Sequence, residues 1–233
     1  MKKLITITMM FLLFESNGCK KEVVNSESIL DLKTELNYLA GLNVGEQINL
    51  EPCNDSNPYD AWGQALFDGF TKLSQAKSEY VISLLKDHEE FEKSLRVEIP
   101  QEYFYLDTTN VNLITVKYLC DEFLSLFIKR NIFEAIYISK KMEVHIYKSK
   151  ILNQYDKAYL LKFVSLIRHS TYLNFTLSNL SKGISYRPFG ACWRAGLQAI
   201  QDSGPFTKIA CVIEWPICLA IIAGDCAYEQ LTQ

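Results

Sequence analysis

Residues 60–73, DAWGQALFDGFTKL, carry large apolar side chains at the spacing of an α-helix. These side chains recur at intervals of four, four and three residues, and they belong to Trp62, Leu66, Phe70 and Leu73. That spacing places them on one face of a helix. Asp60 stands directly before the pattern, where a carboxylate can accept hydrogen bonds from the free amides of a first turn. We therefore expect a helix that follows Asp60 and buries this face.

The same periodicity continues through most of the chain. A second helical run covers residues 78–95, and Pro100 ends that region because proline cannot continue a helical hydrogen-bond ladder. Asn112 can cap a third helix. The residues expected on the buried faces of later helices are Val116, Leu119, Cys120, Phe123, Phe127, Leu160, Phe163, Val164, Ile167 and Leu173. The pattern predicts an all-α helical bundle with short loops.

Residues 135–149, AIYISKKMEVHIYKS, allow a second interpretation. They are rich in β-branched and aromatic residues, so two strands could meet across Lys140 and Lys141. That turn would lack the Gly, Asn or Asp of a typical hairpin. We favour a helix here.

The N-terminus resembles an export signal. Two lysines follow Met1, and residues 4–14 form an apolar run that is shorter than the roughly 20 residues of a membrane-spanning helix. With Gly18 before Cys19 and basic residues after it, the segment resembles a bacterial lipoprotein signal, although Ser16 and Asn17 depart from the usual pattern. This resemblance implies that Cys19 is lipidated. The alternative is an ordinary secreted protein in which Cys19 forms a disulfide.

These features divide the chain. We expect a signal peptide at 1–18, a lipidated tether or loop region at 19–57, a helical domain at 58–182, and a Cys-rich helical hairpin at 183–233 packed on it. The lipid would anchor the exported protein in a membrane. The resemblance implies the outer membrane, with the domain facing the periplasm or the cell surface.

A second resemblance concerns residues 57–70, NPYDAWGQALFDGF. They are similar to a motif of poorly characterised secreted bacterial helical proteins, in which Asn-Pro-Tyr-Asp opens a helix and His-Asn follows about seven residues later. Leu66 and Phe67 stand at that second position here, so the polar pair is missing. The resemblance implies no known activity. Locally, the segment is typical of a proline-ordered loop, a helix cap and a buried Trp62.

No pattern in the chain indicates catalysis or a cofactor. The phosphate-binding, dinucleotide-binding and hydrolase motifs are all missing, and His88, His145 and His169 are too far apart in sequence for a local metal pair. His169 follows Arg168 and precedes Ser170, but adjacent helical residues point in different directions. We predict no catalytic, cofactor-binding or metal site, and regard an enzyme as the less favoured class. The net charge of -3 argues against a nucleic-acid partner.

Cysteines in an exported chain tend to pair. Besides Cys19, the disulfide candidates are Cys53, Cys120, Cys192, Cys211, Cys218 and Cys226. A tight turn at residues 202–205 would place Cys192 opposite a position near 215, so we expect it to bond Cys211 or Cys218. The spacings lack the short hook of a structural zinc site.

The apolar run at residues 209–224 is short for a membrane span and contains Glu214 and Pro216. We expect a core helix in which Arg194 or Lys208 pairs with Glu214. The chain is thus interpreted as a lipid-anchored cell-envelope protein with a non-catalytic binding or structural role, toward an unknown protein or envelope partner. The alternative is a secreted, antagonism-related effector whose Cys-rich hairpin acts on membranes.

Overall fold

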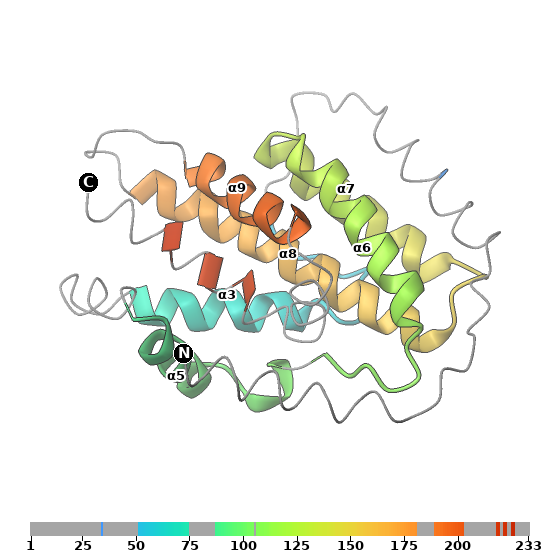
Figure 1. Ribbon diagram of the computed structural model, residues 1–233, viewed down its shortest axis with the longest axis horizontal. Coiled ribbons are helices and arrows are strands. Elements are labelled where there is room, and N and C mark those ends of the chain that lie inside the picture. Colours follow the sequence, from blue (N-terminus) through green and yellow to red (C-terminus); the bar gives the residue numbers. More distant parts are fainter. Residues whose placement is uncertain are drawn as a thin grey trace.

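The computed structural model describes residues 51–74, 87–104, 106–180 and 189–202, together with residue 34 and residues 218–219, 221–222 and 225–226. Its elements are α3 (Ala61–Ser74), α5 (His88–Glu98), the 3-10 turn η1 (Gln101–Tyr103), α6 (Leu113–Ile128), α7 (Ile132–Lys148), α8 (Gln154–Leu180) and α9 (Phe189–Asp202) (Figure 1). The described residues contain no strand, which confirms the all-α fold. The boundary at residue 18 and the run at 75–86 lie outside them.

Polar side chains define where several helices begin. Asn112 accepts a hydrogen bond from the Thr115 amide at the start of α6, so the expected cap is confirmed. Asn131 does the same for α7 by accepting from the Glu134 amide. Helix α7 then passes without a break through Lys140 and Lys141, so the two-strand alternative is wrong there. Each cap satisfies an amide that would otherwise lack a partner within its helix.

Helix α8 is the central element of the bundle. It runs across the middle of Figure 1, with α3 on one side and α6, α7 and α9 on the other. Every residue from 163 to 171 is buried, which shows that α8 is covered on all sides over more than two turns. The faces predicted for α6 and α8 are buried as expected. Leu66 and Phe70 of α3 are buried too, whereas Trp62 is half-buried and meets the edge of Tyr103.

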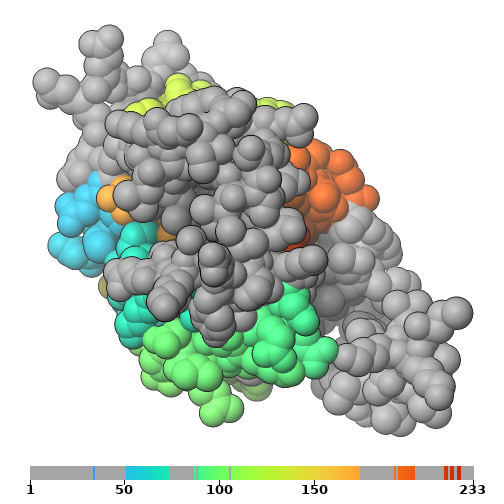
Figure 2. All heavy atoms as spheres, turned by 90° about the vertical axis from the view of Figure 1, so that its left-hand side faces the viewer, coloured from blue at the N-terminus to red at the C-terminus, as the bar shows by residue number. Residues whose placement is uncertain are grey.

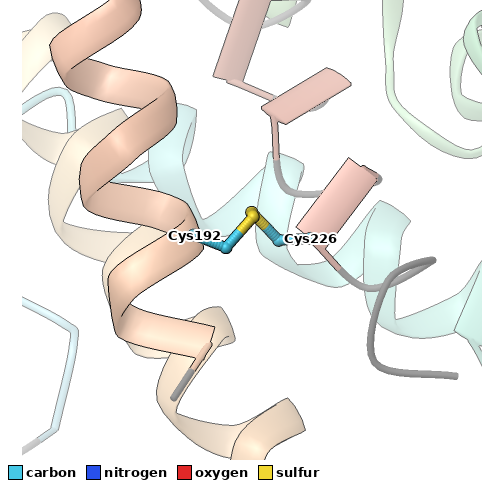
Figure 3. The surroundings of a disulfide bond; sticks show 2 residues. All are labelled: Cys192 and Cys226. Atoms are coloured by element: carbon cyan, nitrogen blue, oxygen red, sulfur yellow. A yellow bond between two sulfur atoms is a disulfide. The ribbon is translucent and has the colours of Figure 1, made fainter. Parts of the chain in front are cut away.

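The described C-terminal residues fold back on α9. Cys192 of α9 forms a disulfide with Cys226, and the two Cα atoms lie 5.7 Å apart (Figure 3). One turn further along, a Cβ on Gly196 would come within 2.4 Å of the Ile222 side chain, so that side chain packs directly on the backbone of α9. Leu197, Leu219 and Cys226 are buried in the main core. A disulfide-stabilised hairpin therefore packs on the bundle.

The expected partners of Cys192 were wrong. The pairs 192 with 226 and 196 with 222 are both symmetric about residue 209. A tight turn at residues 202–205 would have centred the hairpin several residues earlier. The chain therefore returns along α9 in a later register, which leaves Cys218 near the level of Ile200, short of Cys192, and brings Cys226 opposite Cys192.

The other cysteines differ in state. Cys53 is an exposed free thiol and Cys120 is a buried one, so neither candidate is in a disulfide. Burial raises the pKa of the Cys120 thiol well above its usual value, which keeps it protonated and unreactive. Cys218 is disulfide-bonded. Cys19 and Cys211 lie outside the described residues, as do Lys208 and Glu214.

No helix within the described residues is both long enough and apolar enough to cross a membrane. Figure 2 looks at the left-hand side of Figure 1, where segments around α5 (green) and α9 (orange) reach the surface on different sides of the molecule.

Candidate functional site: a buried polar cluster

Seven polar side chains meet where the loop before α3 lies against α7 and α8. We call them the polar cluster: Asn54, Asn57, Asp60, Glu143, Ser165, Arg168 and His169. The side chains of Glu143, Arg168 and His169 are fully buried, and that of Asp60 is 18% exposed. Charged side chains are seldom buried so completely unless they are paired. Among the described residues this is the densest group of buried ionisable side chains.

Arg168 joins two carboxylates from different parts of the fold. Its Nη2 donates to Asp60 Oδ1, at the start of α3, and to Glu143 Oε1 of α7 at 2.8 Å. Three segments that are distant in sequence are thus held by one guanidinium. Charge-assisted hydrogen bonds of this kind are about twice as strong as neutral ones.

Asparagines complete the surroundings of Glu143. Asn57 Nδ2 donates to Glu143 Oε1 at 2.8 Å and to the Leu161 carbonyl at 3.0 Å. Asn54 Nδ2 donates to the other carboxylate oxygen. Asn57 Oδ1 also accepts from the Tyr59 amide at 2.9 Å, which shapes the turn around Pro58. Asn57 and Asp60, the two ends of the Asn-Pro-Tyr-Asp segment, therefore both belong to the cluster. The segment makes tertiary contacts with α7 and α8 in addition to forming a local turn.

The expected capping role of the Asp60 carboxylate was wrong. That carboxylate accepts from the Asn54 amide at 3.0 Å and from Arg168, and it also lies within hydrogen-bond distance of Ser165 and His169. The amide of Gly63, in the first turn of α3, instead donates to Ser165 Oγ at 3.2 Å. Tertiary contacts with α8 therefore replace the local cap.

Gly63 is required by this close approach. A Cβ at this position would lie 2.5 Å from the Ser165 carbonyl oxygen and from His169 Cδ2. Real Cβ atoms do not come so near to backbone, and the carbonyl cannot move without distorting α8. Glycine thus lets α3 cross α8 at the polar cluster.

Burial and pairing shift the ionisation of the cluster in opposite directions. Burial alone would raise the pKa of Asp60, but hydrogen bonds from His169 and Arg168, with the charge of Arg168, hold it well below its usual range. For Glu143, burial prevails over Arg168 and the asparagines, so its pKa is raised. Burial also lowers the pKa of His169, although Asp60 opposes this. The imidazole is therefore neutral at pH 7.

Three atoms of the cluster have no hydrogen-bond partner within the described part of the chain. They are Arg168 Nε, Arg168 Nη1 and His169 Nδ1. The carboxylates of Asp60 and Glu143, which accept from Arg168 Nη2, therefore supply the contacts that offset the cost of removing the guanidinium from water.

The cluster contains acid–base groups but lacks the arrangement of an active site. His169 and Asp60 form a pair of the type that activates a nucleophile, yet Ser165 and Ser170, the nearby hydroxyls of α8, are both buried. The described residues include no group of three side chains placed to hold a metal ion. His145 lies near the end of α7, outside the cluster. The arrangement fixes the start of α3 against α7 and α8.

Comparisons with known proteins identify no family. No family model matches the chain, and neither the curated proteins nor the solved structures include a match.

The sequence interpretation missed Glu143 and Arg168, although both interrupt apolar patterns. Glu143 shares a buried face of α7 with Ile136, Ser139 and Ile146. Arg168 follows the apolar residues around Ile167 in a segment that is buried throughout. Two opposite charges in otherwise apolar helical faces indicate a buried ion pair, and this signal could have found them.

His169 makes stability depend on pH. Its folded pKa lies below the usual value of about 6.5, so the stabilisation is complete above that pH and is lost as the pH falls toward the folded pKa. Below about pH 6.5, and until the folded pKa is reached, we expect this group to lower the free energy of unfolding by up to about 1.4 kcal/mol per pH unit. Glu143, with a raised pKa, contributes in the opposite direction.

Urea unfolding of the wild type and of His169→Gln, measured at several pH values, isolates the contribution of His169 to the pH dependence of stability. The variant should be less stable at pH 7 and should show the smaller loss on acidification. Equal pH slopes for the two proteins would contradict the assignment.

Proposed function

We propose that this protein is an exported, lipid-anchored cell-envelope protein whose helical domain serves as a non-catalytic binding or structural module. The anchor would be the lipidated Cys19, as the signal-like N-terminus indicates. Disulfides are typical of exported proteins, and Cys192 and Cys226 are in one. The observation that carries the non-catalytic role is the polar cluster. Its acid–base groups are buried, and their contacts with one another hold the start of α3 against α7 and α8.

The alternative of an effector with a membrane-acting hairpin has less support. Leu197, Leu219 and Cys226 are part of the main core, so releasing the hairpin would expose them. Exposing a large apolar side chain costs about 1.5–3 kcal/mol. The Cys192–Cys226 bond adds a covalent restraint within the same hairpin.

Lipidation can be tested directly in cells. The wild-type chain, expressed in a bacterium fed radiolabelled palmitate, should incorporate label and sediment with the membranes. Cys19→Ser should lose the label, whereas Cys53→Ser, which alters an exposed free thiol, should keep it. Labelling that survives Cys19→Ser, or an unlabelled wild type, would refute the anchor.

A further inference from the structure

One end of the bundle gathers exposed apolar side chains. Helix α6 begins, α7 ends and α8 begins on the right-hand side of Figure 1. A hydrogen bond of 2.8 Å from the Asn112 amide to Asp156 Oδ1 joins the start of α6 to the start of α8. Another, of 3.2 Å from Lys157 Nζ to the Tyr147 carbonyl, joins α8 to the end of α7. These contacts make the three helix ends one surface.

The exposed side chains at this end combine apolar, aromatic and basic groups. We use the name end patch for Leu113, Ile114, Tyr147, Lys148, Lys150, Ile151 and Tyr155, which are exposed, together with Lys157, which is half-buried. Tyr147 is 56% exposed and Ile114 is 55% exposed, although both belong to helices that are otherwise well buried. Single exposed apolar residues are ordinary, but several at one helix end mark an interaction site.

The charge of the end patch is opposite to that of the whole chain. The protein carries a formal net charge of -3, whereas residues 147–157 contain three lysines and a single acid. That acid, Asp156, is buried and accepts hydrogen bonds from Asn112 and Asn153. The loop before α6 adds one exposed carboxylate, Asp107, which accepts from the Thr109 amide. The patch therefore presents a positive, partly apolar surface.

We propose that the end patch lies on an anionic lipid membrane. Tyrosine rings suit the headgroup region of a bilayer because one edge is apolar and the other is polar. Lysines can bury their stems and keep their ammonium groups among lipid phosphates. Leu113, Ile114 and Ile151 would enter the boundary between headgroups and acyl chains. The inference rests on the proposed lipid anchor, which keeps the chain near a membrane.

An acidic protein is the other partner that could bind these lysines. The membrane is favoured because the apolar and aromatic residues come from three joined helix ends and are interspersed with lysines. This is the composition of an interfacial membrane contact. The lipid would tether only the N-terminal cysteine, and a basic patch can supply a second attachment for the helical domain.

The test uses the full chain reconstituted in phosphatidylglycerol-rich vesicles and in purely zwitterionic vesicles. Amide hydrogen exchange in peptides covering residues 111–116 and 147–157 should slow in the anionic vesicles alone. The protection should weaken as salt rises, because exposed charges are screened beyond about 10 Å at 0.1 M. Lys148→Gln with Lys150→Gln should weaken patch binding by about five-fold per lysine, from about 1 kcal/mol each.

The control is Val97→Ser, which alters an exposed apolar residue of α5. It should leave the protection unchanged, while Tyr147→Ser with Ile151→Ser should abolish it. No protection of the end patch in anionic vesicles, or protection by an added acidic protein in its place, would overturn the proposal. The intact mass of the purified chain reports acylation separately. An acylated chain without patch protection refutes this inference alone, and an unacylated chain refutes the anchor alone.

Discussion

Arg168→Met is expected to lower the free energy of unfolding by about 3–5 kcal/mol. Methionine approximates the length of the arginine stem but removes the cation shared by Asp60 and Glu143. Glu143 is fully buried, so its charge would remain without a partner cation. Chemical unfolding at pH 7, followed by circular dichroism, measures the loss. At lower pH the loss should shrink, because Glu143 can then take up a proton.

A matched surface pair provides the control for Arg168. Lys117 and Asp121 of α6 form a 3.0 Å ion pair one helical turn apart, and both side chains are about a third exposed. Lys117→Met should therefore cost less than about 1 kcal/mol. Adding Glu143→Gln to Arg168→Met should recover part of the loss, since the uncompensated charge is removed. If Arg168→Met costs no more than Lys117→Met, the polar cluster does not hold the helices together.

Cys192→Ser with Cys226→Ser is expected to produce the second large loss. The bond joins positions separated by 34 residues. Closing a loop of that length restricts the unfolded chain by about 4 kcal/mol in the chain-entropy model, within a usual range of about 2–4 kcal/mol. Thermal and urea unfolding of the oxidised wild type and the double variant measure the difference. Both members of the bonded pair are replaced, so the double variant gains no new unpaired cysteine.

Cys53→Ser is the control for the disulfide, because Cys53 is an exposed free thiol. It should leave stability unchanged within about 0.5 kcal/mol. The double variant should also lose protection in α9 before the bundle unfolds. A double variant as stable as the wild type would show that packing of Leu197 and Leu219 alone holds the hairpin.

Local signals account for the helices that were predicted correctly. The apolar spacing on α3, α6 and α8 repeats with the helical period. Asn112 caps α6 by accepting from the amide of Thr115, only three residues later. Such features depend on neighbours in sequence. They could therefore be predicted without the tertiary structure.

The polar cluster depends on contacts that sequence spacing does not encode. Asp60 stands in a good local capping position, yet its carboxylate faces Arg168, more than a hundred residues later. The same holds for the hairpin, whose register is set by the approach of Gly196 to Ile222 and not by the nearest turn signal. In both places a tertiary contact displaced the local preference that the sequence suggested.

The position of the polar cluster has a mechanical consequence. In a chain held by its N-terminus, tension would reach α3 through residues 51–60. Among the described residues, that stretch is tied down by the Asn54 amide on Asp60 and by the Asn54 and Asn57 side-chain amides on Glu143. Those bonds pass the load across to α7 and α8 before it reaches the backbone of α3. The force would then shear several bonds together, which resists rupture better than peeling one helix away turn by turn.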